Sequence, residues 1–397
     1  MSWLYRHLIR PALFLQDPET IHDRMMRALR WAGRHELCCD AIESFLGAAD
    51  LPVELFGLRF PNPVGLAAGM DKYGDALPVW RALGFGFAEL GAVTWQAQPG
   101  NPMPRVFRAV ADGAIVNRMG FNNPGAAAMA KRLEEWRALR RWPNHPVGIN
   151  LGKSKTTPLE RAAEDYASSF RVLQTYFDFF VVNVSSPNTP SLRKLQDKSA
   201  LDEILAALQQ SQCQSQIANG KSLIATVPAH SPGHINSEGP KPILVKVAPD
   251  LSFDALDEIL ELAGPRHVAG IVATNTTITR PSARAPALQR AYAEAGGLSG
   301  LPLRARSTEV IRHLYRQVQG TLPIVGVGGI FSAADAWEKI VAGASLVQVY
   351  TGMVYEGPGL AKEIVTGLLE RLERAGLRQL REAVGIESAK ESQCSRA

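Results

Sequence analysis

The chain has few cysteines and no long apolar run. Only four of its 397 residues are cysteine, at positions 38, 39, 213 and 394, and their spacing fits no metal-binding pattern. Adjacent Cys38 and Cys39 rarely pair with each other, so we expect free thiols in a reducing compartment. No apolar run reaches the roughly 20 residues of a membrane-spanning helix, and no signal-peptide pattern is visible. These absences favour a globular protein without a structural metal.

Two other common signals are missing. The formal net charge of +5 is small for this length and gives no indication of a nucleic-acid partner. No Gly-x-Gly-x-x-Gly pattern opens the first helix of the repeating part, which disfavours a dinucleotide. With 46% hydrophobic and 20% charged residues, the chain can bury a large core.

Residues 1–36 differ from the rest of the chain. Two amphipathic helical patterns flank Asp17, and residues 1–34 carry six arginines against three acidic residues, a net charge of +3. A short basic amphipathic helix pair is typical of an interfacial membrane anchor. A helical hairpin packed on the main domain would show the same pattern. The two interpretations are compatible.

A strand-then-helix unit repeats between residues 50 and 380. Each unit has a short apolar run, a polar or glycine-rich end and a helical pattern. Near-continuous apolar strands that alternate with helices predict an α/β fold, a parallel (β/α)8 TIM barrel. The predicted strands are Val64–Ala68, Phe87–Val93, Val147–Leu151, Phe179–Val184, Ile243–Val247, Gly270–Ala273, Pro323–Val327 and Leu346–Tyr350.

Three segments do not fit the repeat. Residues 105–117 predict an additional hairpin with a turn at Asp112-Gly113. Residues 209–240 are rich in Ser, Gln, His, Gly and Pro and predict a surface insertion. Residues 387–397 form a polar tail.

Polar residues gather where the predicted strands end, which is where barrel enzymes carry their active sites. The stretch Val181–Pro190 leads from an apolar run into Asn183, two serines and Asn188, between stiffening prolines. Such a loop suits a small planar polar ligand, although taken alone it could be a turn that caps the next helix. Lys246 lies within an apolar strand, and a buried ammonium group needs a partner. We therefore expect it to face a bound anion or an electron-rich ring.

Glycines follow the seventh predicted strand, at Gly326-Val-Gly-Gly329. Glycines before a helix N-terminus at this place in a barrel form a phosphate cradle. Residues 296–300 and the Tyr350-Thr351-Gly352 turn could complete it with further amides and a hydroxyl. One phosphate on a flat cofactor favours flavin mononucleotide (FMN).

The chain resembles the class 2, quinone-dependent dihydroorotate dehydrogenases from about residue 5 to residue 375. Its N-terminal pattern is similar to the helical extension that distinguishes class 2 from class 1. The ordered motifs that carry the resemblance are Asn62-Pro-Val-Gly-Leu-Ala-Ala-Gly69, Asn117-Arg-Met-Gly-Phe-Asn122, Gly148-Ile-Asn-Leu-Gly-Lys153, Asn183-Val-Ser-Ser-Pro-Asn-Thr189, Lys246-Val-Ala-Pro-Asp250, Thr274-Asn-Thr-Thr277 and Gly326-Val-Gly-Gly329.

The resemblance implies oxidation of (S)-dihydroorotate to orotate in pyrimidine synthesis, with FMN and then a membrane quinone. It implies Ser186 as the catalytic base, where class 1 enzymes have cysteine. The implied FMN contacts are Ala67, Ala68, Gly69, Met70, Asp71, Lys72, Ala92, Asn150, Asn183, Lys246, Thr274, Gly300, Gly329, Tyr350 and Thr351. The implied contacts to dihydroorotate or orotate are Lys72, Asn117, Arg118, Met119, Gly120, Phe121, Asn183, Asn188, Asn275 and Thr276.

The sequence departs from the family pattern at three positions. Ala92 stands where a Thr or Ser is usual, so only a backbone contact to FMN is expected there. Trp95 replaces a common proline, and Tyr73 replaces a smaller polar residue. Two other functions stay open at this point. One is a flavin barrel oxidoreductase acting on uracil-type rings or 2-hydroxy acids, although the latter usually need a histidine that follows no predicted strand here. The other is a degenerate barrel that serves as a membrane-surface module.

The predicted location follows from the N-terminal helices. We expect residues 1–36 to bind an anionic membrane surface peripherally, and the absence of a targeting segment favours the cytoplasmic side of the cell membrane. We expect a monomer.

Overall fold

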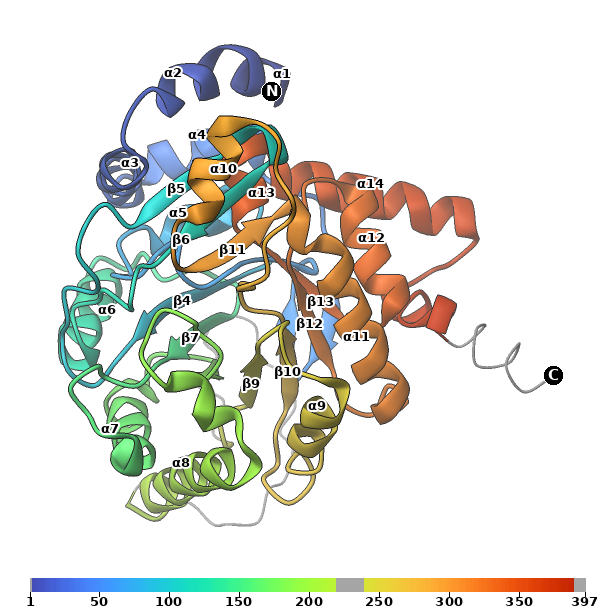
Figure 1. Cartoon of the computed structure of the whole chain (residues 1–397). Coiled ribbons are helices and arrows are strands. Elements are labelled where there is room, and N and C mark those ends of the chain that lie inside the picture. Colours follow the sequence, from blue (N-terminus) through green and yellow to red (C-terminus); the bar gives the residue numbers. More distant parts are fainter. Residues whose placement is uncertain (1, 219–238, 389–397) are drawn as a thin grey trace.

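A computed structural model describes residues 2–218 and 239–388 of the chain (Figure 1). Its centre is a closed parallel barrel in which β10 is followed by β12, β13, β3, β4, β7, β8 and β9. The barrel strands are β3 (Val64–Leu66), β4 (Phe87–Val93), β7 (Val147–Leu151), β8 (Phe179–Asn183), β9 (Ile243–Val247), β10 (Gly270–Ala273), β12 (Ile324–Val327) and β13 (Leu346–Val349). The predicted TIM barrel is confirmed, with its eight strands.

A helix returns the chain after each barrel strand. The order is α5 (Leu77–Ala82), α6 (Ala126–Ala138), α7 (Ala162–Leu173), α8 (Lys198–Ala218), α9 (Phe253–Leu260), α11 (Arg304–Val318), α12 (Ala333–Ala342) and α14 (Leu360–Ala375). The barrel strands are buried along their whole length, because helices cover the outer face and side chains fill the lumen. Gly65 permits this filling, since a Cβ atom there would lie 2.2 Å from the Phe87 ring.

The N-terminal end of the barrel is closed by a hairpin that the sequence analysis did not predict. Strands β1 (Val53–Leu55) and β2 (Leu58–Phe60) pair antiparallel. The Phe60 ring packs edge-on against Phe87, with centroids 5.3 Å apart. This apolar plug fills the bottom of the lumen with side chains and keeps water out of it.

A second small sheet stands beside the opposite end of the barrel. The predicted hairpin at 105–117 is confirmed as β5 (Val106–Ala109) and β6 (Ala114–Asn117), joined by η2 (Val110–Asp112). The structure adds β11 (Gly297–Gly300), which pairs with β6 in antiparallel register. Helix α10 (Pro286–Ala293) packs against this sheet (Figure 1).

The N-terminal extension, residues 2–46, lies over this end of the molecule (Figure 1). It consists of α1 (Ser2–Leu4), a π-helical segment η1 (Tyr5–Ile9), α2 (Arg10–Phe14), α3 (Pro18–Gly33) and α4 (Glu36–Leu46). The helical character predicted for residues 1–36 is confirmed, and α4 continues it further. No helix within residues 2–218 and 239–388 is long and apolar enough to cross a membrane.

Polar contacts hold the extension on the barrel. The Glu19 carboxylate accepts hydrogen bonds from Nε and Nη2 of Arg105, at 3.0 and 2.6 Å. Arg6 pairs with Glu356 at 2.7 Å, at the end of α13 (Thr351–Glu356). The hydroxyl of Tyr5 donates to the Val354 carbonyl at 2.9 Å. The extension is therefore fixed to the barrel as well as amphipathic, as the sequence analysis allowed.

The predicted start of the insertion, residue 209, lies within helix α8. Helix α8 continues to Ala218, because residues 209–218 include no Gly or Pro that would end a helix. Residues 219–238 lie outside the described residues, as do residues 389–397 of the predicted tail.

Candidate functional site

One cavity of about 670 Å³ opens at the carboxyl ends of the barrel strands and continues beneath the N-terminal extension. At the barrel end its walls carry amide, hydroxyl and ammonium groups, and beneath the extension they are mostly apolar. The predicted site residues that line it are Ala67, Ala68, Gly69, Met70, Lys72, Ala92, Asn117, Met119, Gly120, Phe121, Asn150, Asn183, Ser186, Asn188, Lys246, Thr274, Asn275, Thr276, Gly300, Gly329, Tyr350 and Thr351.

The structure turns two predicted side chains away from this cavity. The Asp71 carboxylate is fully buried below it and accepts hydrogen bonds from the backbone of Asp75 and Ala76 and from Nε1 of Trp80. Burial raises the pKa of Asp71. Arg118 points outward and pairs with Glu294 at 2.6 Å. Neither side chain lines the cavity. The ligand contacts predicted for Asp71 and Arg118 are therefore limited to their backbone.

The floor of the cavity is organised by Glu89, which the sequence analysis missed. Its carboxylate accepts hydrogen bonds from Asn150 and Gln348, each at 2.6 Å, and lies 3.7 Å from Nζ of Lys246. These four residues come from β4, β7, β13 and β9, so one buried carboxylate joins four strands. Glu89 is a charged residue within an otherwise apolar strand, which is the same signal that identified Lys246. That signal could have found Glu89 from the sequence.

A chain of amides leads from Glu89 to the loops above. Nδ2 of Asn183 donates to Oδ1 of Asn150 at 2.7 Å. Nδ2 of Asn275 then donates to Oδ1 of Asn183 at 3.2 Å and to Oγ of Ser185 at 2.9 Å. Each amide is held by its neighbour, so donor and acceptor groups are already oriented around the lumen.

The two adjacent serines have different surroundings. Ser185 is fully buried, and its hydroxyl donates to Asn183 and accepts from Asn275. Ser186 lines the cavity, and its Oγ accepts a hydrogen bond from the backbone N–H of Asn188 at 3.3 Å. The side chain of Asn188 in turn donates to Asn117 at 3.1 Å. Of the two, Ser186 is the one that can meet a ligand.

Lys72 supplies a cation at the rim of the same space. Its Nζ donates to Oδ1 of Asn122 at 2.9 Å. Burial is the main cause that lowers the pKa of Lys72 to about 8, and the nearby Glu19 opposes this shift. The ammonium group is thus a buried charge that can pair with an anion within the cavity.

The glycine turn after β12 lines the cavity at the place where the sequence predicts a phosphate cradle. Gly329 adopts a φ of +70°, and a Cβ atom there would lie 2.4 Å from Cβ of Arg304. Only glycine fits at this position, and the backbone of Gly328 and Gly329 lines the cavity. Beside it, Oγ1 of Thr351 donates to Oγ of Ser299 at 2.9 Å. Gly300 lies at the end of β11, so the strand added by the structure delivers it to the cradle.

The outer half of the cavity is formed by the N-terminal extension and has few polar groups. Burial is the main cause that lowers the pKa of His22 to about 4, so its ring is neutral. Arg108 donates to the Gln16 carbonyl at 2.8 Å. The apolar residues that line this half are Ile9, Leu13, Phe14, Ile21, Met25, Met26, Leu29, Ile42 and Leu46. The described residues hold no group of three or more His, Cys, Asp or Glu side chains that could bind a metal.

Comparison with known proteins gives consistent matches over nearly the whole chain. A family model described as dihydroorotate dehydrogenase matches residues 50–372. A relative from Gloeobacter violaceus, named dihydroorotate dehydrogenase (quinone), is 54% identical over 384 residues, which cover 96% of this chain and 98% of the relative. The protein of the same name from Nostoc punctiforme is 51% identical, over 97% of this chain and 98% of its own.

Solved structures show the same similarity. The crystal structure of DHODH from Eimeria tenella in complex with ferulenol matches with a TM-score of 0.79 and 36% sequence identity. The match covers 94% of this chain and 96% of that one. The ligand-free form from the same organism matches with a TM-score of 0.78.

Proposed function

Because the chain belongs to the dihydroorotate dehydrogenase family, we propose that it oxidises (S)-dihydroorotate to orotate in pyrimidine synthesis, using FMN and then a membrane quinone. The observation that carries this proposal is the convergence of Ser186, the amides of Asn117, Asn188 and Asn275, and the Lys72 ammonium group on one cavity. A hydroxyl, a set of amides and a cation match the acidic C–H, the ring amides and the carboxylate of dihydroorotate.

The residues present fit FMN. A Cβ atom at Gly329 would clash with Arg304, so this position requires glycine. The backbone of Gly328 and Gly329 lines the cavity, where its amides can meet a phosphate. At the floor, Oε1 of Gln348 is buried and has no hydrogen-bond partner among the described residues, although it lines the cavity. Together with Lys246 and Asn150, this orphaned acceptor supports a heteroaromatic ring with amide edges as the occupant. When bound, FMN supplies the hydride acceptor of the reaction.

The side chains have distinct parts in the reaction. Lys72 binds the substrate carboxylate, and the asparagines orient the ring through its amides. The Ser186 hydroxyl takes the proton from C5 of dihydroorotate, and its orientation by Asn188 prepares it for this step. Oγ1 of Thr189 is buried without a partner in the described part of the chain. A water held there would carry the proton outward.

Lys246 provides positive charge at the floor of the cavity. Its side chain is 7% exposed and pairs with the Glu89 carboxylate at 3.7 Å. A fixed cation in a site without water stabilises negative charge that develops next to it. Ala92 offers no hydroxyl, so its part is limited to backbone contact.

The apolar half of the cavity suits an isoprenoid quinone. It leads from Tyr350 and the barrel mouth out between α2, α3 and α4. Large apolar side chains are also exposed on the outer surface of the extension, among them Trp3, Leu8, Leu15, Trp31, Leu37 and Phe45. Exposed arginines, including Arg24 and Arg27, accompany them. Apolar anchors with basic neighbours support binding to the surface of an anionic membrane, from which the quinone would enter.

Anaerobic reduction tests this function. Dihydroorotate added to the purified protein without oxygen should bleach the flavin absorbance near-stoichiometrically, and a water-soluble quinone should restore it. Orotate, which is already oxidised, should leave the flavin absorbance in place, and L-lactate would detect a 2-hydroxy acid dehydrogenase. Protein that carries FMN but is not bleached by dihydroorotate would refute the proposal.

A further inference from the structure

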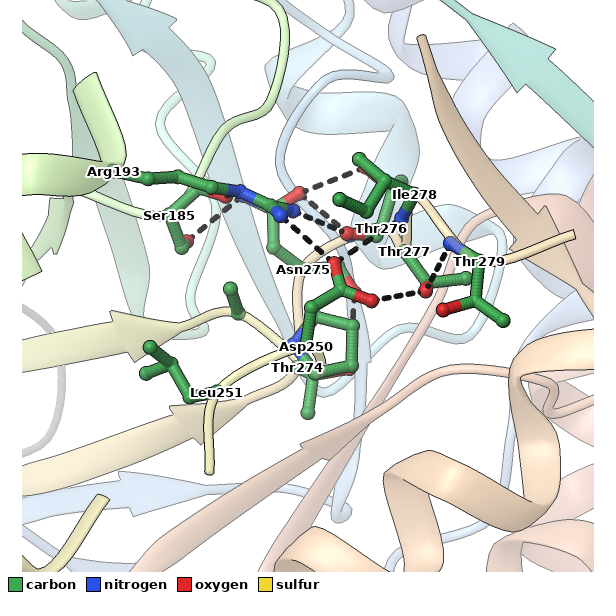
Figure 2. A network of polar contacts seen from close by, with 12 residues as sticks. Ser185, Arg193, Asp250, Leu251, Thr274, Asn275, Thr276, Thr277, Ile278 and Thr279 are labelled. Atoms are coloured by element: carbon green, nitrogen blue, oxygen red, sulfur yellow. Dashed lines mark hydrogen bonds and ion pairs between the residues drawn. The ribbon is translucent and has the colours of Figure 1, made fainter. Parts of the chain in front are cut away.

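Arg193 connects the loops around the proposed active site although it does not line the cavity. It lies in η4 (Leu192–Gln196), shortly after Ser186 in the chain. Its Nε donates to the carbonyl of Ser185 at 3.1 Å and its Nη2 to the carbonyl of Thr276 at 3.1 Å. Its Nη1 pairs with Oδ2 of Asp250 at 2.8 Å (Figure 2). One guanidinium group therefore joins the loops that follow β8, β9 and β10.

Asp250 completes the connection from the other side. Its carboxylate accepts the hydroxyl of Thr277 and the backbone N–H of Ile278, the latter at 3.1 Å (Figure 2). Arg193 holds the carbonyl of Thr276, and Asp250 holds Thr277 and Ile278, so the pair fixes the segment 276–278. The adjacent Asn275 donates to Ser185, which links this segment back to the serine loop.

We infer that the Arg193–Asp250 pair positions the loop of Ser186 and the segment of Asn275 and Thr276 against each other for proton removal from the substrate. This inference rests on the proposed function. Both are positioning residues, because they hold the backbone immediately before Ser186 and around Thr276 and do not line the cavity.

The geometry explains why arginine is needed. Beyond Asn183 and Ala273 the strands have ended, so the carbonyls of Ser185 and Thr276 have no partners in the barrel ladder. A planar guanidinium group offers donors in several directions at once, whereas an ammonium group is a point charge on a flexible stem. Misplacement of a reacting group by about 1 Å can cost on the order of 100-fold in rate. The pair thus restricts movement of the serine loop relative to the segment of Asn275 and Thr276.

A matched control exists elsewhere in the fold. Arg266 and Asp202 form a bidentate pair, with both contacts at 2.6 Å, between α8 and the turn after α9. Their side chains are partly exposed, at 30% and 35%, somewhat more than the 23% and 16% of Arg193 and Asp250. Arg266 holds no loop of the cavity, so removing it measures only the loss of an arginine–aspartate pair.

The experiment compares the two half-reactions in FMN-loaded Arg193→Gln, Arg193→Lys, Asp250→Asn, the Arg193→Gln/Asp250→Asn double variant and Arg266→Gln. Stopped-flow bleaching by dihydroorotate gives the limiting reduction rate and the half-saturating concentration. Reoxidation by a water-soluble quinone gives the second rate. Flavin content and thermal midpoint are measured on the same samples.

For Arg193→Gln we expect a limiting reduction rate lower by roughly 10- to 100-fold, with reoxidation within about twofold of the native rate and full flavin content. Arg193→Lys should recover part of the loss. The double variant should be about as slow as the slower single variant, because residues that act as a unit are non-additive. Arg266→Gln should reduce at the native rate.

Other results would overturn the inference. Native reduction rates in Arg193→Gln and Asp250→Asn would show that the pair is dispensable, and an equal loss in both half-reactions would show a general structural role. If Arg193→Gln does not fold, Asp250→Asn, which keeps the shape of the side chain, decides alone. A native chain that dihydroorotate does not bleach would overturn the proposed function first and this inference with it.

Discussion

Replacement of Glu89 by glutamine tests whether the floor of the cavity depends on charge. Glu89 is fully buried, accepts hydrogen bonds from Asn150 and Gln348 and is the ionic partner of Lys246. Glutamine keeps the shape and removes the charge. Its amide group would meet the amide of Gln348, but Oε1 of Gln348 lacks a partner among the described residues. A flip of Gln348 therefore restores the hydrogen bond.

The magnitude follows from the charge that remains. Lys246, 7% exposed, would be left without its carboxylate at 3.7 Å. Removing one member of a buried ion pair costs about 3–5 kcal/mol in the free energy of unfolding. With an unfolding entropy of about 2.1 cal/mol/K per residue, a chain of 397 residues loses roughly 0.8 kcal/mol per degree. The melting temperature of Glu89→Gln should thus fall by about 4–6 °C.

The assay is urea and thermal unfolding of Glu89→Gln, Lys246→Met and the double variant. Replacing both members of a buried pair by neutral groups is often close to neutral. We therefore expect the double variant to be more stable than the sum of the two single changes by about 2 kcal/mol or more. A Glu89→Gln variant within about 0.5 kcal/mol of the native chain, or strictly additive changes, would refute the ionic role of Glu89.

Four further outcomes follow from the site. Ser186→Ala should slow flavin reduction by dihydroorotate by roughly two to four orders of magnitude with flavin content intact; a native rate in Ser186→Ala together with a loss in Ser185→Ala would reverse the assignment. Lys246→Ala should lose bound flavin or its reduction, and full retention of both would make Lys246 structural. Because the pKa of Lys72 is lowered to about 8, its charge is present below that pH and lost above it. The KM for dihydroorotate should therefore rise above about pH 8, and Lys72→Arg, whose charge persists, should remove the rise. Deletion of residues 1–36 should leave flavin reduction largely intact but lower turnover with a long-tailed quinone and weaken salt-sensitive binding to anionic vesicles; unchanged quinone turnover and vesicle binding would leave the extension a packing element.

Only part of the structure of the N-terminal extension could be predicted from its local sequence pattern. Its amphipathic helices and basic surface could be predicted, since period and charge are properties of neighbouring residues. That α2, α3 and α4 line the outer half of the same cavity could not be predicted. It requires Arg105, just before β5, and Arg108 of β5 to meet Glu19 and Gln16 of the extension. Sequence separations of 86 and 92 residues carry no periodic signal.

The sequence by itself determined the barrel and most of the cavity lining. Apolar strands buried on both faces alternate with helices, and a barrel places every strand's carboxyl end at one mouth. Asn150, Asn183, Lys246 and Thr274 could therefore be assigned to one site without coordinates. Asp71 could not be placed correctly by the same reasoning, because a position at a strand end does not state which way the side chain turns. Its carboxylate finds three donors below the cavity.

Only the tertiary structure decided which polar and charged groups meet. Glu89 and Gln348 are 259 residues apart and adjacent across the lumen. Arg193 lies 57 residues from Asp250 and 83 from Thr276, yet one guanidinium group reaches both. The spacing of side chains along a strand or helix is set by backbone geometry within a few residues, so it can be recognised in the sequence. Contacts between loops depend on barrel closure, which brings distant strand ends together, so they exist only in the folded chain.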